Sequence, residues 1–151
     1  MVFQWKPLAC VKADPQAAGE QMKRLEETGH LTPKNLLDAN REVGSPLHDD
    51  FEWDDNVAAE KYREDQAAYF IRQITVVEER PSKESVPVRA FVNTKVNDTR
   101  SYLSISRVLS DNELRANLLL KAKADMQVFK TKYESLEELS DVFRAMDEVI
   151  A

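Results

Sequence analysis

Residues 74–106 constrain the fold most, because they are the one stretch with strand-like patterning between long helical patterns. ITVVEE at 74–79 is rich in β-branched residues, VPVRAFVN at 86–93 alternates apolar and polar positions, and SYLSIS at 101–106 follows the turn residues KVNDTR. These three segments predict the strands of one small antiparallel sheet. Helical patterns before and after these segments in the sequence predict an α+β fold.

Residues 14–73 carry the signals of helix starts. An Asp-Pro pair at 14–15 and a Thr-Pro pair at 32–33 each place a capping side chain before a proline at the first helical position. These pairs predict an N-terminal helical hairpin. A longer third helix is expected over residues 55–73. Residues 1–13 suit a short extended arm or an edge strand.

The last part of the chain, residues 110–151, predicts a second helical hairpin. Each of its helices opens with a capping box, in which a serine precedes a glutamate by three residues: Ser110 with Glu113, and Ser135 with Glu138. The final helix has one apolar stripe with helical spacing, formed by Leu136, Leu139, Phe143, Met146 and Ile150. We predict that this stripe belongs to the core; the alternative is an oligomer or partner surface. The 151 residues fit a single domain.

Composition excludes several classes of function. A formal net charge of −6 is a poor basis for binding a phosphate backbone. The single cysteine, Cys10, rules out an internal disulfide and a zinc finger, and three glycines leave no phosphate-binding loop or dinucleotide fingerprint. No apolar run is long enough to cross a membrane, and the N-terminus lacks the pattern of a signal peptide. We therefore expect a cytosolic protein without membrane contact.

The segment LHDDFEWDD, residues 47–55, concentrates one histidine, five carboxylates and two aromatic rings. Its spacing matches neither a calcium-binding loop nor a helical zinc site, so we expect no metal. We interpret it first as a helix start that is capped by Asp54 or Asp55. Phe51 and Trp53 alternate with the acids and are expected to be buried. The second interpretation is a docking surface for a protein partner, made by His48, Asp49, Asp50 and Glu52.

Two surfaces support an alternative function in nucleic-acid binding. The hairpin at 14–42 is similar to a helix-turn-helix, whose second helix would begin at Pro33 and display Lys34, Asn35, Asp38, Asn40 and Arg41. Its acids, however, approach phosphates unfavourably. Basic side chains of the next-to-last helix are spread around that helix and comprise Lys121, Lys123, Lys130 and Lys132. An ordinary helical hairpin and a solvated basic face are the commoner explanations.

Several motifs resemble a family of small phage and prophage proteins. They are a helix that starts with LTP, the runs SPLH, FEWDD and AAEKYR, a PVRAF strand, and two final helices with a LEEL-type segment. The run from SPLH to YR is the most specific of them, and the resemblance covers nearly the whole chain from about residue 14. It implies a viral setting, in the host cytoplasm or the virion. It carries over no activity and no catalytic residue.

Together these patterns predict a non-catalytic phage-type protein that acts through protein–protein contacts. It would be a virion or assembly component, or an acidic modulator of a host factor, and its partner a viral protein, a host protein or a second copy of the chain. No motif identifies a catalytic residue, a metal ligand or a cofactor site. A nucleic-acid-binding regulator is the first alternative, and a small enzyme with an unrecognised carboxylate site is the second.

Overall fold

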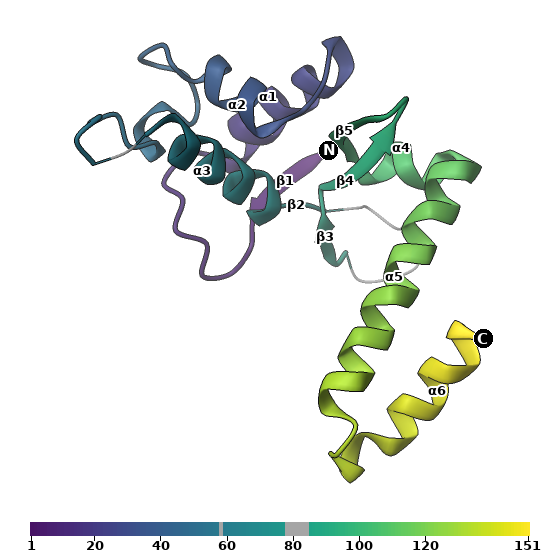
Figure 1. Ribbon diagram of the computed structural model, residues 1–151. Helices are drawn as coiled ribbons and strands as arrows, with labels where there is room; N and C mark the ends of the chain where they lie inside the picture. Colours follow the sequence, from purple (N-terminus) through teal and green to yellow (C-terminus); the bar gives the residue numbers. More distant parts are fainter. Residues whose placement is uncertain (58, 78–84) are drawn as a thin grey trace. The chain divides into compact units, whose positions relative to one another are not determined.

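The computed structural model describes residues 1–57, 59–77 and 85–151. Helices and small antiparallel sheets make up these residues, which confirms the α+β fold class. The chain forms two compact units, Met1–Arg107 and Val108–Ala151, and Figure 1 shows the elements of each. That the whole chain acts as one domain stays a prediction.

The first unit contains a three-stranded antiparallel sheet. Its strands, in spatial order, are β1 (Val2–Trp5), β2 (Ile74–Val77) and β3 (Pro87–Arg89). The β-branched segment therefore forms the central strand, where Val76 lies opposite Phe3 on one side and Val88 on the other. The N-terminal arm is an edge strand, in agreement with the sequence. Residues 78–79 of the predicted strand lie outside the described residues.

A separate two-stranded hairpin follows, formed by β4 (Phe91–Val96) and β5 (Thr99–Ser104). Its turn residues Asn97 and Asp98 have φ angles of 49° and 63°, the left-handed conformation that two-residue hairpin turns need. The turn is thus confirmed. The expectation of a single sheet over 74–106 is wrong, because the strands belong to two sheets.

Ala90 is the point at which the predicted strand 86–93 divides into β3 and β4. Its backbone N–H donates to the Ile74 carbonyl at 3.3 Å, while its carbonyl accepts from the Ile105 N–H at 2.9 Å. These two partners lie in different elements. The chain therefore leaves one sheet and enters the other at this residue, which no local pattern in the sequence indicates.

Both predicted proline starts are confirmed in the first unit. α1 (Pro15–Thr28) is capped by Asp14, whose carboxylate accepts a backbone N–H of the first turn at 2.8 Å. α2 (Pro33–Ala39) is capped by Thr32, whose hydroxyl accepts a backbone N–H at 3.1 Å. Each cap satisfies a donor that the helix itself leaves without a partner. The two helices form the N-terminal part of the core.

The third helix begins later than predicted. α3 spans Glu60–Gln73, and its N-cap is Ala59, which makes no side-chain cap bond. Asp54 instead accepts from the backbone N–H and the side-chain amide of Asn56, both at 2.9 Å, in a local turn. The predicted aspartate cap is therefore wrong, because the turn uses that carboxylate. Residue 58 of the predicted helix lies outside the described residues.

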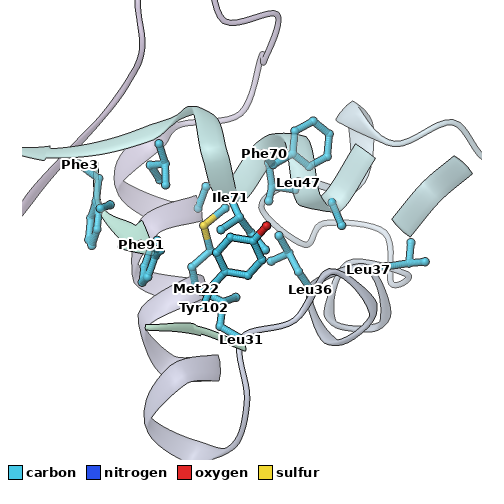
Figure 2. Packing of buried hydrophobic residues seen from close by; sticks show 14 of the residues in the cluster. Phe3, Met22, Leu31, Leu36, Leu37, Leu47, Phe70, Ile71, Phe91 and Tyr102 are labelled. Atoms are coloured by element: carbon cyan, nitrogen blue, oxygen red, sulfur yellow. The ribbon is translucent and has the colours of Figure 1, made fainter. Parts of the chain in front are cut away.

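The core of the first unit joins its first strand to its last ones. Phe3 of β1 stacks on Phe91 of β4, with 6.3 Å between the ring centroids. Gly19 of α1 makes room for this stack, because a Cβ atom there would lie 2.1 Å from the Phe3 ring. Figure 2 shows the two rings with other buried side chains of the cluster, among them Met22, Leu31, Leu36, Leu47, Ile71 and Tyr102.

The chain passes into the second unit through α4 (Ile105–Ser110). This short helix ends β5 at Ser104, so the predicted strand 101–106 is two residues too long. The next helix is α5 (Asn112–Tyr133), and its cap is Asp111, which accepts from two backbone N–H groups at 3.0 Å. The predicted cap by Ser110 is therefore wrong by one residue.

The hairpin closes with η2 (Glu137–Leu139), a single 3-10 turn, and α6 (Ser140–Ile150). The α-helix begins five residues after the predicted cap at Ser135 and has no side-chain cap bond. The second capping box is therefore wrong. A 3-10 turn before an α-helix tightens the connection between two helices, and here it turns the chain back alongside α5.

Candidate protein-interaction site

The second unit buries few of its apolar side chains. Within residues 108–151, all of which the structure describes, Val108 and Phe143 alone are buried. Seven large apolar side chains of the α5–α6 hairpin are at least 40% exposed. We call them the hairpin apolar surface: Leu119, Leu120, Val128, Phe129, Leu136, Val142 and Val149.

Two causes leave these side chains exposed: the helices differ in length, and some of the side chains point away from the partner helix. α5 has 22 residues and α6 has 11, which correspond to roughly 33 Å and 17 Å at 1.5 Å per residue. α6 packs along the C-terminal half of α5, where the rings of Phe129 and Phe143 lie 6.4 Å apart and Lys130 binds Asp147 at 2.6 Å. Figure 1 shows the N-terminal half of α5 extending beyond α6. This overhang leaves Leu119 and Leu120 without a covering helix of this unit, whereas Val128, Val142 and Val149 face away from the partner helix.

α5 is also apolar on more than one face. Leu118 and Met126 are half-buried on the side toward α6, whereas Leu120 and Val128 are 65% and 68% exposed elsewhere on the helix. Sequence reasoning missed this second face. Its signal is the run LLL at 118–120, because successive helical residues turn by about 100° and three adjacent leucines cannot share one face.

The predicted apolar stripe of the last helix is core only in part. Phe143 is 7% exposed, while Leu139, Met146 and Ile150 are half-buried. Leu136 is 45% exposed, so the core prediction is wrong for that residue. One partner helix covers one side of the stripe, and no second helix of this unit covers the other.

Charge divides the hairpin between its two arms. α5 contains five basic and two acidic side chains, a balance of +3, whereas residues 134–151 contain one basic and six acidic side chains, a balance of −5. The Lys130–Asp147 pair joins the two arms. A partner would thus meet apolar residues that are flanked by positive charge on one helix and by negative charge on the other.

The acidic aromatic segment is anchored in the first unit. Phe51 is 6% exposed, and its ring packs edge-on against Phe70 at 4.9 Å. Trp53 is half-buried: its indole N–H donates to the His48 carbonyl at 2.7 Å, and its ring stacks on the imidazole at 4.9 Å. The guanidinium of Arg63 lies over the same indole at 5.4 Å. The expected burial is confirmed for Phe51 and is partial for Trp53.

The four residues predicted to dock a partner here mostly serve the fold. His48 Nδ1 lies 2.9 Å from the carbonyl oxygen of Asn40. The Asp50 carboxylate accepts from two backbone N–H groups of the N-terminal arm at 2.7 and 2.8 Å, and Glu52 accepts a nearby backbone N–H at 2.9 Å. Asp49 is exposed. The segment fastens the arm beside α2, and its docking role stays a prediction.

Arg63 ties the same segment to α3. The side chain is buried, its Nε donates to the Glu52 carbonyl at 2.8 Å, and its guanidinium pairs with Asp55. Asp55 therefore neutralises a buried cation and does not cap a helix. Within the described ranges, no group of three His, Cys, Asp or Glu side chains is placed to hold a metal ion.

The candidate nucleic-acid contacts on α2 are engaged within the chain. Lys34 and Arg41 both bind Asp38, at 2.8 and 2.9 Å. The hydrogen bond from Lys34, with a second from Arg41, holds the pKa of Asp38 below its ordinary value, and the same bond raises the pKa of Lys34. The side-chain amide of Asn35 donates to the His30 carbonyl at 2.7 Å. Lys34 of α2 and Arg41, which follows the helix, thus already neutralise Asp38.

Asn40 does not lie on the surface that the helix-turn-helix hypothesis requires. Its side chain is fully buried, and its Nδ2 donates to Gln21 Oε1 and to the Leu36 carbonyl, both at 2.8 Å. Its Oδ1 accepts from the Leu47 N–H at 2.9 Å. The expected display of Asn40 is therefore wrong, because this residue closes the end of α2.

The four α5 lysines form two pairs on different faces. Lys121 and Lys132 are exposed and lie within about 20° of each other around the helix. Lys123 and Lys130 form the second pair, on a face about 160° away from Lys121. Lys132 Nζ lies over the Tyr133 ring at 5.2 Å, and Lys130 is paired with Asp147. The lysines therefore do not make one continuous basic stripe, which agrees with the spread around the helix that the sequence predicts.

No helix among the described residues has both the length and the apolar character to span a membrane. Comparisons of the chain with known protein families, with curated proteins and with solved structures found no match. The candidate site thus rests on the geometry of this chain itself.

Proposed function

We propose that this chain is a non-catalytic protein that acts through protein–protein contacts, made by the hairpin apolar surface. The observation that carries the proposal is the exposure of seven large apolar side chains on one hairpin. A contiguous group of exposed apolar side chains commonly marks an interaction site, and Val128, Val142 and Val149 are the members of this set that lie on one side of the hairpin. Charges of opposite sign on the two arms add specificity, because the charged rim of an interface selects its partner more than it strengthens binding.

The exposed apolar area is large enough to matter. Burying one large apolar side chain is worth about 1.5–3 kcal/mol, so covering the exposed half of all seven, which point in more than one direction around α5, has an upper bound on the order of 5–10 kcal/mol. Association itself costs at least about 4 kcal/mol. The surface therefore supports a contact whose final strength depends on how well the flanking charges match.

The phage-type setting rests on the sequence motifs, above all the SPLH to YR run. In that setting the chain is a virion or assembly component, or an acidic modulator of a host factor, in the host cytoplasm or the particle. Mass spectrometry of purified particles separates these roles. A fixed copy number per particle supports a virion component, and absence from the particle supports an assembly factor or a modulator.

Partner recovery with matched surface variants tests the proposed function. The tagged full chain is expressed in the cell that naturally produces it, as wild type, as Val128→Lys with Val149→Lys, or as Val43→Lys with Val57→Lys. The control positions lie in the first unit and are 82% and 68% exposed. We expect a stoichiometric protein that is recovered with the wild type and the control and lost with the hairpin variant. Equal recovery by all three chains would contradict the proposal.

A further inference from the structure

We propose that the hairpin binds a second copy of this chain, and that two hairpins join as an antiparallel four-helix bundle. This inference rests on the proposed function, because it names the partner of the same surface. In the bundle, the exposed face of α5 around Val128 packs against the exposed face of α6 around Val142 and Val149 of the other copy. The same contact forms twice.

The face of α5 is a shallow hollow that is bordered by charges. Val128 is 68% exposed; Lys121 and Lys132 lie within about 40° of it around the helix, and Asp125 lies about 60° away on the same side, so the two cations outnumber the one acid. A surface depression of about 350 Å³ lies at this place, and its lining residues are Gln127, Val128, Thr131 and Lys132. The side chains of a facing helix would fill it in the manner of helix bundles.

The face of α6 is an apolar ridge with a negative rim. Val142 and Val149 are seven residues apart and so share one face of the helix, where they are 46% and 48% exposed. Acidic residues border this ridge, namely Glu138, Asp141 and Glu148. The ridge therefore complements the hollow of α5 in apolar character and in the sign of its charge.

Both faces lie on the same side of the hairpin. The Val128 face lies about 130° around α5 from the residues that contact α6, and the Val142 face lies about 100° around α6 from Phe143, in the same rotational sense. Because the two helices are antiparallel, rotations in the same sense about their own axes turn both faces toward the same side of the hairpin. A two-fold axis parallel to the helices then sets each α5 against the α6 of the other copy.

Charge argues for a second copy as the occupant. A two-fold interface brings one surface patch against itself, so the patch must be self-complementary. The hairpin meets this requirement on the two faces concerned, because Lys121 and Lys132 outnumber Asp125 beside Val128, whereas the residues that border the α6 ridge are acids. A partner with a single sign of charge would match one arm and be repelled by the other.

Complementary charge reversal tests this arrangement in the full-length chain. The acidic variant carries Lys121→Glu and Lys132→Glu, and the basic variant carries Glu138→Lys and Glu148→Lys. Neither variant changes the Lys130–Asp147 pair within the hairpin. The control carries Lys61→Glu and Lys95→Glu, at exposed lysines of the first unit. A dye is attached to the exposed Cys10, the single cysteine of the chain. Sedimentation of the labelled chain then measures its association with itself and with the other variant. Circular dichroism checks that each variant is folded.

We expect the wild type and the control to dimerise alike, and each reversed variant to dimerise at least tenfold more weakly. Mixing the two variants should restore a dimer, because both α5–α6 contacts are again between opposite charges. A wild type that is monomeric up to about 100 µM, or folded variants that do not associate when mixed, would overturn the inference. If the wild type is monomeric but still recovers another protein, and the Val128→Lys, Val149→Lys variant does not, the proposed function stands and the second-copy inference fails. If the wild type is monomeric and recovers no protein, both the inference and the proposed function are contradicted.

Discussion

Removing the carboxylate of Glu26 should destabilise the first unit strongly. This side chain is 1% exposed in α1; its Oε1 accepts from the Ser104 N–H at 2.7 Å and from the Ser104 hydroxyl at 3.0 Å, and its Oε2 binds Lys23 at 2.7 Å. It thereby joins α1 to the end of β5. Glu26→Ala leaves the buried Ser104 N–H without its acceptor and removes the short ion pair of Lys23, which costs about 3–5 kcal/mol. Glu26→Gln keeps a neutral acceptor, so we expect roughly half of that loss.

Urea unfolding followed by tryptophan fluorescence measures the effect in the right unit, because Trp5 and Trp53 are the two tryptophans of the chain and both lie in the first unit. At a slope of about 2 kcal/mol per M, the Glu26→Ala midpoint should fall by roughly 1.5–2.5 M. The matched control is Glu27→Ala: that side chain is 61% exposed and 3.8 Å from the same lysine, so its loss should stay within about 0.5 kcal/mol. Equal midpoints for the two alanine variants would refute the reasoning.

Three further outcomes are expected, two in the first unit and one for the described part of the chain as a whole. Phe51→Ala should cost about 3–5 kcal/mol in the same unfolding experiment, because the ring is buried against Phe70; a loss below 1 kcal/mol would contradict its place in the core. NMR titration should find the pKa of Asp38 below its ordinary value and raised by Lys34→Ala, so that the stabilisation from this ion pair is present above the ordinary carboxyl pKa and is lost as pH falls through the lowered one; an unchanged pKa in the variant would be the contrary result. Calcium, magnesium, manganese or zinc, added at sub-millimolar concentration to chelated protein, should raise the unfolding free energy by less than about 1 kcal/mol, because no metal-binding group is found in the described part of the chain; a larger rise would show a missed site.

Local signals predicted the parts of the fold that local contacts determine. Asp14 and Thr32 cap their helices as expected, because a cap needs only a side-chain oxygen and the next few backbone N–H groups. The same rule failed for Asp54, whose carboxylate closes a turn with Asn56 before the helix begins. Several acids in succession offered several caps, and the sequence does not show that α3 uses none of them and begins after Ala59.

Distant contacts decided what local patterns could not predict. The strand pattern of residues 86–93 continues through Ala90, yet hydrogen bonds to Ile74 and Ile105 move the chain from one sheet to the other there. In the hairpin, the apolar stripe of α6 was visible in the sequence, but its burial depends on how many helices pack against it. The longer α5 covers one side of the stripe and no second helix of this unit covers the other, so the stripe is only half covered and the interaction surface follows.

Photo-cross-linking inside the producing cell tests most directly whether the hairpin apolar surface contacts another protein chain. A photoreactive amino acid replaces Val128 in one experiment and Val57, which is equally exposed at 68%, in the other. We expect discrete adducts of defined mass at position 128, which Val149→Lys removes, and only background at position 57. Equal yields at the two positions, or no adduct at position 128 in a folded chain, would contradict a contact through the hairpin.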